Sequence, residues 1–109
     1  MAAIRWTFQA EKWLQGIHNY IAQDNPVAAQ KVVMDIYKKT ELLTDFPEIG
    51  YKYCDEKEGE IRILLYGHYR IAYLINKTSD SLDIIGVFHG ALEIERYLQR
   101  RIFKEKTLI

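Results

Sequence analysis

The chain has 109 residues, of which 49% are apolar and 13% aromatic. This length predicts one domain over residues 1–109, because two smaller pieces could not bury stabilising cores, and the apolar content excludes a disordered chain. Fifteen basic side chains balance fifteen acidic ones, which excludes a uniformly basic surface for nucleic acid. The lone Cys54 cannot form an internal disulfide, and no stretch reaches the roughly 20 apolar residues that span a bilayer. We expect a cytoplasmic protein with no membrane partner.

The first half of the chain predicts one strand and two helices. Ala3–Phe8 alternates apolar and polar residues, as a half-buried strand does. Gln9–Asp24 repeats apolar residues at steps of three and four, which predicts a helix. The Asn25-Pro26 pair favours a new helix start, and a second apolar stripe continues to about Asp45. The two helices should form an αα-hairpin that covers one face of a sheet.

The second half predicts a meander of three strands and a last helix. Glu48–Gly59 lacks a regular apolar period and is interpreted as an exposed connector. Glu60–Tyr66, Tyr69–Ile75 and Leu82–His89 are predicted strands on short loops, which makes them antiparallel neighbours. Ala91–Phe103 has a helical pattern. The predicted class is α+β in the order β-α-α-β-β-β-α, with the helical hairpin on one face of a small, mainly antiparallel sheet.

Two arginines lie inside apolar strands, where a guanidinium is costly unless it is paired or functional. Gly67-His68 suits a two-residue hairpin loop, which sets Tyr66 opposite Tyr69 and Arg62 opposite Tyr73. The two-residue period of a strand then points Arg62 and Arg70 to opposite faces. Only one of them can lie on the face that the helices leave open, and the sequence does not say which. The other is expected to be structural, bonded to a carboxylate or a backbone carbonyl.

His89 ends the last predicted strand and precedes Gly90, at a sharp turn. An imidazole there can act as a general acid or base or bind a phosphate, and it can equally brace the turn. The three histidines are far apart in sequence, with no pair at ligand spacing, so we expect no metal site. The glycines are scattered singly, and neither a phosphate loop nor a nucleophile elbow is found. We expect no cofactor.

Four segments in order resemble the ParE/RelE superfamily of toxins from bacterial toxin–antitoxin pairs, over nearly the whole chain. They are YIAQDNPVAAQKV (residues 20–32), LLTDFPEIG (42–50), GHYRIAYLI (67–75) and VFHGALEIERYL (87–98). The resemblance implies a cytoplasmic, plasmid-stabilising toxin neutralised by a cognate antitoxin, whose otherwise disordered segment wraps the toxin. ParE-like members inhibit DNA gyrase without known catalysis, whereas RelE-like members cut messenger RNA on the ribosome.

The run from His89 to Glu93 is more similar to the ParE branch, in which a histidine, a small residue, a hydrophobic residue and an acid lead into the last helix. RelE-like nucleases use several basic residues, and often a tyrosine, around the phosphate. Here Ala91 and Leu92 follow the histidine instead. Zero net charge also argues against docking on ribosomal RNA.

The leading hypothesis is a ParE-like gyrase inhibitor without committed catalytic residues. Its target-binding candidates are Arg62, Tyr69, Arg70, Tyr73 and His89. The alternative is a ribosome-dependent mRNA endonuclease that uses Arg70, His89 and Arg62. A third hypothesis is a degenerate member that only binds antitoxin, for which the exposed hairpin surface or a free sheet edge offers a site. A homodimer and a toxin–antitoxin hetero-oligomer both remain open.

Overall fold

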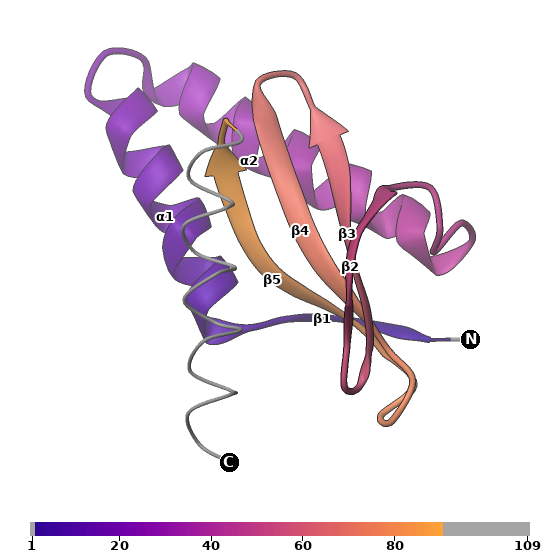
Figure 1. Ribbon diagram of the computed structural model, residues 1–109. Coiled ribbons are helices and arrows are strands. Elements are labelled where there is room, and N and C mark those ends of the chain that lie inside the picture. The colour runs from indigo at the N-terminus through magenta and orange to yellow at the C-terminus, as the bar shows by residue number, and fades with distance from the viewer. Residues whose placement is uncertain (1, 91–109) are drawn as a thin grey trace, which may run out of the picture.

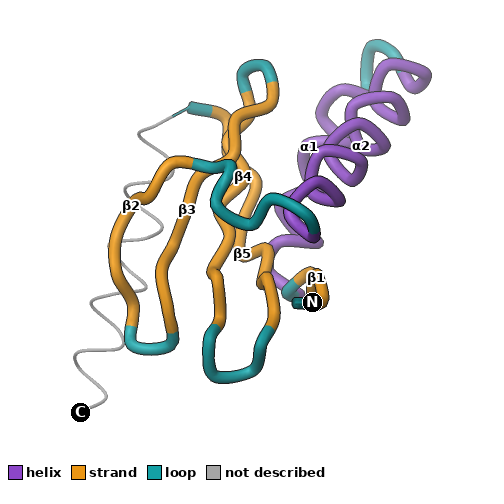
Figure 2. The backbone as a smooth tube through the Cα atoms, turned by 90° about the vertical axis from the view of Figure 1, so that its right-hand side faces the viewer, coloured by secondary structure: helices purple, strands orange, loops and turns teal. Residues whose placement is uncertain are grey.

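The computed structural model of the protein describes residues 2–90, and in this part of the chain two α-helices lie on one side of a five-stranded sheet. The strand order is β1-β5-β4-β3-β2. Viewed along the sheet, both helices lie on the same side of it and run next to each other (Figure 2). The predicted α+β class and the hairpin on one face are confirmed.

Both helices of the hairpin have a side-chain cap, and only the second cap was predicted from the sequence. β1 (Ala3–Trp6) leads into α1 (Phe8–Ala22), whose first turn is capped by Thr7, the side chain of which accepts a hydrogen bond from the Ala10 amide at 3.2 Å. Asn25 caps α2 (Pro26–Glu41) in the same way, with proline at the first helical position. The last predicted turn of the second helix is a separate 3₁₀ turn, η1 (Leu42–Thr44).

The sheet has one strand more than the sequence predicted. β2 (Tyr51–Glu56) pairs antiparallel with β3 (Gly59–Tyr66), so the interpretation of this segment as an exposed connector is wrong. A register shift between Lys52 and Cys54 interrupts the two-residue period by which a strand is predicted. β2 is also an edge strand, which pairs on one side only and therefore tolerates polar residues. β4 (Tyr69–Asn76) and β5 (Ser81–His89) complete the antiparallel meander as predicted. β1 joins β5 in parallel.

The Gly67-His68 turn sets the predicted register. Tyr66 pairs with Tyr69 and Arg62 with Tyr73. Gly67 has a φ of 56°, and His68 is not among the residues of positive φ, as expected for a turn with glycine at its first central position. The prediction for this hairpin is confirmed.

Each face of the sheet carries its own apolar cluster. Toward the helices, Ala10, Leu14 and Ile36 pack on strand residues such as Leu64, Ile71, Tyr73, Ile84 and Val87. The opposite face carries Ile61, Ile63, Ala72, Leu74, Ile85 and Phe88, packed with Trp13, Tyr53 and Cys54. All six residues of this second cluster are buried, so the expectation of an open face is wrong at its centre. The predicted last helix, residues 91–103, lies outside the described residues.

A buried carboxylate joins the first strand to the last. Asp83 is 4% exposed and pairs across the parallel strands with Arg5, whose Nη2 donates to the carboxylate at 2.9 Å. Ser81 donates to the same carboxylate at 2.7 Å and Asn76 at 3.1 Å. Burial alone would raise the pKa of Asp83, but these hydrogen bonds and the charge of Arg5 outweigh it, so the pKa is lowered. The ionised form therefore stabilises the fold.

Replacing Asp83 by asparagine should lower the free energy of unfolding at pH 7 by about 1–3 kcal/mol, because an amide cannot accept all three donors. A lowered pKa gives stability that is present above the unfolded-state value and is lost as the pH falls through the folded-state value. The difference between the variant and the wild type should shrink below about pH 4. Urea unfolding at pH 7 and pH 3 measures both. The exposed Asp80→Asn is the matched control, and an equal difference at the two pH values would contradict the assignment.

Candidate functional site

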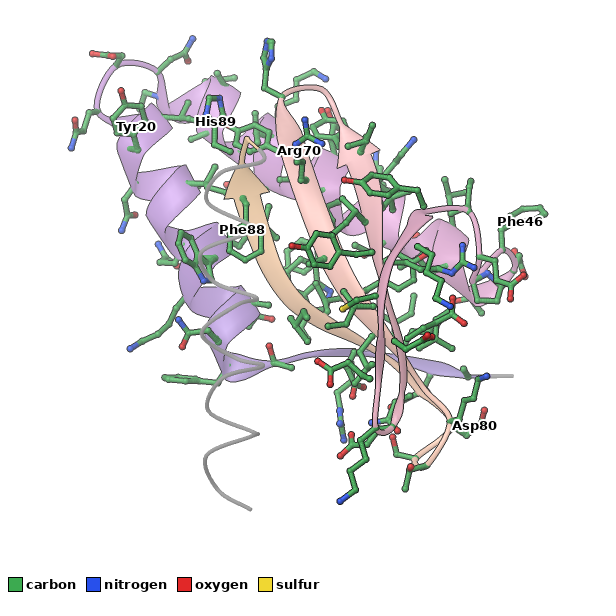
Figure 3. All side chains as sticks on the ribbon, viewed as in Figure 1. Tyr20, Phe46, Arg70, Asp80, Phe88 and His89 are labelled. Carbon is green, nitrogen blue, oxygen red and sulfur yellow. The ribbon has the colours of Figure 1, made fainter. Side chains whose placement is uncertain are left out.

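The ends of β3, β4 and β5 bring together four polar or aromatic side chains and the turn residue His68. We call Tyr66, His68, Tyr69, Arg70 and His89 the rim. Tyr69 pairs with Tyr66 on one side and His89 on the other, while Arg70 pairs with Leu65 and Phe88. Figure 3 shows His89 and Arg70 at this end of the sheet, far from Asp80.

The imidazole of His89 lies among other rings. The His89 ring centre is 5.5 Å from that of Tyr69, in an edge-on arrangement, and 6.1 Å from that of His68. His89 is exposed, whereas Tyr69 is half-buried. This cluster gives the rim one rigid aromatic and two imidazole groups within a short distance, a surface suited to packing against a partner.

Tyr66 ties the rim to the second helix. Its hydroxyl donates to Asp35 of α2 at 2.8 Å, and Lys31, one turn earlier on α2, donates to the same carboxylate at 2.9 Å. The hydrogen bonds from Lys31 and Tyr66 lower the pKa of Asp35, and the bond to Asp35 raises the pKa of Tyr66. The Tyr66 phenol therefore stays protonated near neutral pH and acts as a donor, so its role is positioning.

Arg62 lies on the helix-facing side and is fully engaged by the protein itself. Its Nε donates to Glu60 at 2.6 Å, and its Nη1 donates to the carbonyls of Glu48 at 3.1 Å and Gly50 at 2.7 Å. Only 16% of its side chain is exposed. Arg62 is therefore the structural arginine of the two, bonded to both a carboxylate and backbone carbonyls.

Tyr73 shares this structural role. It is fully buried, and its hydroxyl donates to the Pro47 carbonyl at 2.7 Å while accepting from the Gly50 amide at 3.1 Å. Burial raises the pKa of its phenol. A β-carbon at Gly50 would lie 2.7 Å from the Ile63 carbonyl oxygen, so only glycine lets the loop approach this closely. Arg62 and Tyr73 hold the 46–50 loop and offer no free surface for a target.

Arg70 lies on the other face, half-buried beside the exposed Leu65. No hydrogen bond or ion pair joins its guanidinium to another residue in the 2–90 range. The predicted opposition of the two arginines is confirmed, and Arg70 is the one on the face away from the helices. Because the pleat alternates, His89 and Arg70 also belong to opposite faces, His89 sharing its face with Tyr69 and Val87.

A cavity of about 620 Å³ lies beside the rim, between α1 and the ends of β4 and β5, and the sequence did not predict it. Most of its lining comes from one stripe of α1. The lining residues are Gln9, Lys12, Trp13, Gly16, Ile17, Tyr20, Ile21, Tyr69, Val87 and His89. The sequence predicted an apolar stripe along this helix, and of α1 only Ala10 and Leu14 are buried. Figure 3 shows Tyr20 at the same end of the molecule as His89.

Among residues 2–90 no group of three or more His, Cys, Asp or Glu side chains could hold a metal ion. No helix in that range is both long enough and apolar enough to cross a bilayer. The side chains of the rim carry imidazole, phenol and guanidinium groups.

The model of a family described as the ParE toxin of the type II toxin–antitoxin system parDE matches residues 4–94. The chain belongs to this family. The matched span contains the whole rim and every described element except the first residue of β1, so the resemblance to the ParE/RelE superfamily is confirmed.

Individual relatives come from both branches of the superfamily. Toxin RelE2 of Caulobacter vibrioides is 36% identical over 50 residues, which cover 46% of this chain and 57% of that protein. The chromosomal ParDE system of P. aeruginosa contains a chain of similar fold, with a TM-score of 0.67, 19% identity, and coverage of 84% of this chain and 98% of that one. The RelBE2 toxin–antitoxin complex of Mycobacterium tuberculosis gives a TM-score of 0.51, 20% identity, and coverage of 82% and 98%. At these identities the two structures show a shared fold.

The two arginines should respond oppositely to the same substitution. Arg62→Gln should lower the free energy of unfolding by about 2–3 kcal/mol, because it leaves Glu60 and two loop carbonyls without a charged donor. Arg70→Gln should change it by less than about 0.5 kcal/mol. Chemical denaturation of both variants measures the difference. Equal destabilisation by the two substitutions would show that the division into a structural and a surface arginine is wrong.

Proposed function

We propose that the protein is the toxin of a type II toxin–antitoxin pair, acting in the cytoplasm by binding DNA gyrase through its rim, and held inactive by a cognate antitoxin. Membership of the ParE toxin family supports the toxin role. The two solved structures of similar fold come from toxin–antitoxin systems, which supports an antitoxin partner.

The placement of Arg70 and His89 on opposite faces of the sheet supports binding over cleavage. Cutting RNA at a phosphate requires a base for the 2′-hydroxyl, an acid for the leaving group and a cation for the phosphate charge, all around one point. His89 and Arg70 face different sides, and the guanidinium of Arg62 is already bonded to Glu60 and the loop. The described residues therefore do not converge on one phosphate.

The rim has the composition of a protein-binding surface. Tyrosine and arginine are enriched among the residues that contribute most to protein interfaces, and tyrosine buries a large area with few rotatable bonds. Tyr69 and His89 meet edge-on on one side, while Arg70 and the half-exposed Leu65 extend the surface to the other side. A partner that grips the end of the sheet can contact both faces at once, so their opposition is no obstacle to binding.

A second function deserves its own test, because Toxin RelE2 matches the chain at 36% identity. Under this alternative the protein is an mRNA endonuclease of the ribosome, with Arg70 neutralising phosphate charge and His89 transferring a proton. His89→Ala should then abolish cutting of ribosome-bound message and leave the protein folded.

Purified protein should inhibit gyrase supercoiling without cutting ribosome-bound message. His89→Ala and Arg70→Ala should each raise the concentration for half-inhibition about tenfold, because each removes a contact at the rim. Lys38→Ala, an exposed change on α2, is the control and should behave as the wild type. Cleavage of message with unaffected supercoiling would replace this proposal by the endonuclease. A chain that does neither and still binds antitoxin would be the degenerate member.

A further inference from the structure

His68 and His89 are far apart in the sequence, and the fold brings their side chains together. His89 ends β5 and pairs directly with Tyr69, the first residue of β4. His68 precedes Tyr69 in the two-residue turn, so it lies diagonally across from His89. The centres of the two imidazole rings are 6.1 Å apart, and both residues are exposed. For this pair, strand pairing removes the separation in sequence on which the expectation of no metal site was based.

The distance between the two rings matches a pair of imidazoles on one metal ion. A Zn²⁺ ion binds an imidazole nitrogen at about 2.0–2.1 Å, which places the ion about 3.2 Å from the ring centre. The centres of two bound rings are then about 4.5 Å apart when the ligands form a right angle, and about 6.4 Å apart when they lie on opposite sides of the ion. The observed 6.1 Å falls inside this range. Rotation of the exposed His68 side chain can bring the rings to the shorter distance of a tetrahedral ion.

The fold holds this pair in place before any ion binds. The ring of Tyr69 packs edge-on against His89, with centres 5.5 Å apart, and restricts the rotation of that imidazole. The backbone of His68 is fixed by its turn, which Gly67 enters with a φ of 56° and which the pairing of Tyr66 with Tyr69 closes. An ion needs one nitrogen of each ring, so the other nitrogen can stay bonded within the protein. Binding therefore does not have to order a loop, which lowers its entropic cost.

Imidazole ligands determine the class of ion. Zn²⁺, Ni²⁺ and Cu²⁺ bind imidazole well, whereas Mg²⁺ and Ca²⁺ prefer oxygen ligands. Residues 2–90 contain no group of three His, Cys, Asp or Glu side chains for a metal, so the described rim offers two protein ligands. A structural zinc site has four protein ligands and a catalytic one has three. An ion on two histidines keeps further positions open, which makes it exchangeable.

We propose that His68 and His89 together bind one divalent transition metal ion of the zinc, nickel and copper class at the end of the sheet, with water in the remaining positions. This site does not depend on the proposed function, because it follows from the distance between two side chains. It exists only in the folded chain, since the turn and the end of β5 meet through strand pairing. Bound metal therefore stabilises the native state, increasingly as its concentration rises.

Metal titration of the full-length chain without an affinity tag tests the site. By calorimetry, Zn²⁺ should bind at one ion per chain, and Mg²⁺ at the same concentrations should not bind. His68→Gln and His89→Gln should each weaken Zn²⁺ binding at least about tenfold, because even a supporting partner of a ligand is worth about 10–100-fold in metal affinity. His18→Gln removes the third histidine, which lies on α1, and should bind as the wild type does. Unchanged affinity in His68→Gln or in His89→Gln overturns the proposal.

Paramagnetic Ni²⁺ shows where the ion binds. At substoichiometric Ni²⁺ the amide NMR signals of His68, Tyr69 and His89 should broaden first. The signals around Cys54, the one thiol of the chain, should stay sharp. Broadening centred on Cys54 or on His18 would assign the binding to another residue and would overturn the proposal.

Thermal unfolding separates a lost ligand from a damaged fold. Without metal, His68→Gln should melt within about two degrees of the wild type, because the side chain is exposed. Saturating Zn²⁺ should raise the melting temperature of the wild type by several degrees and leave that of His68→Gln unchanged. Equal rises in the two proteins would contradict the site. In sedimentation velocity the zinc-bound chain should behave as the metal-free chain does, and one ion per two chains with a doubled mass would place the ion between molecules instead.

Discussion

The register of one hairpin decides which side chains of this protein can meet a partner. Two residues, Gly67 and His68, join β3 to β4, and a slip of a single position would exchange the two faces of the sheet. With the observed pairing, Arg62 turns toward the helices and Arg70 away from them. The same alternation places the side chain of His89 on the sheet face that carries Tyr69. The turn therefore decides on which face of the sheet each of these side chains lies.

Two charged groups of the sheet, Asp83 and Arg62, are bonded within the protein, and this distinguishes them from the groups at the rim. Asp83 is surrounded by three donors, and the guanidinium of Arg62 is bonded to one carboxylate and two carbonyls. A buried polar group that loses its hydrogen bonds costs more free energy than those bonds contribute to stability. A partner could therefore bind these groups only by breaking internal bonds that the fold needs. Arg70 carries no such commitment within residues 2–90. Its guanidinium can therefore pair with a group of a binding partner without breaking a bond within these residues.

Local signals predicted the helices, the Asn25 cap and the hairpin register because each depends on residues close in sequence. Asn25 and Gly67 act within three positions of themselves. β2 was missed because its strand period is broken by a bulge and its partner lies across the sheet. The cavity was missed because helical spacing shows that a stripe is apolar but not what covers it. That the carbonyls of Glu48 and Gly50 would accept from Arg62 likewise depended on how the 46–50 loop folds against β3, which no sequence pattern reports.

The parallel pairing of β1 with β5 has a consequence for folding during synthesis. β1 pairs with a strand almost eighty positions later in the sequence, where Arg5 contacts Asp83 at a separation of 78. Until Ser81–His89 has emerged, β1 has no neighbour and the helical hairpin has no finished layer to lie on. Contacts this distant along the chain also form slowly. The sheet, and with it the rim residue His89 on β5, therefore cannot be complete before β5 has emerged from the ribosome.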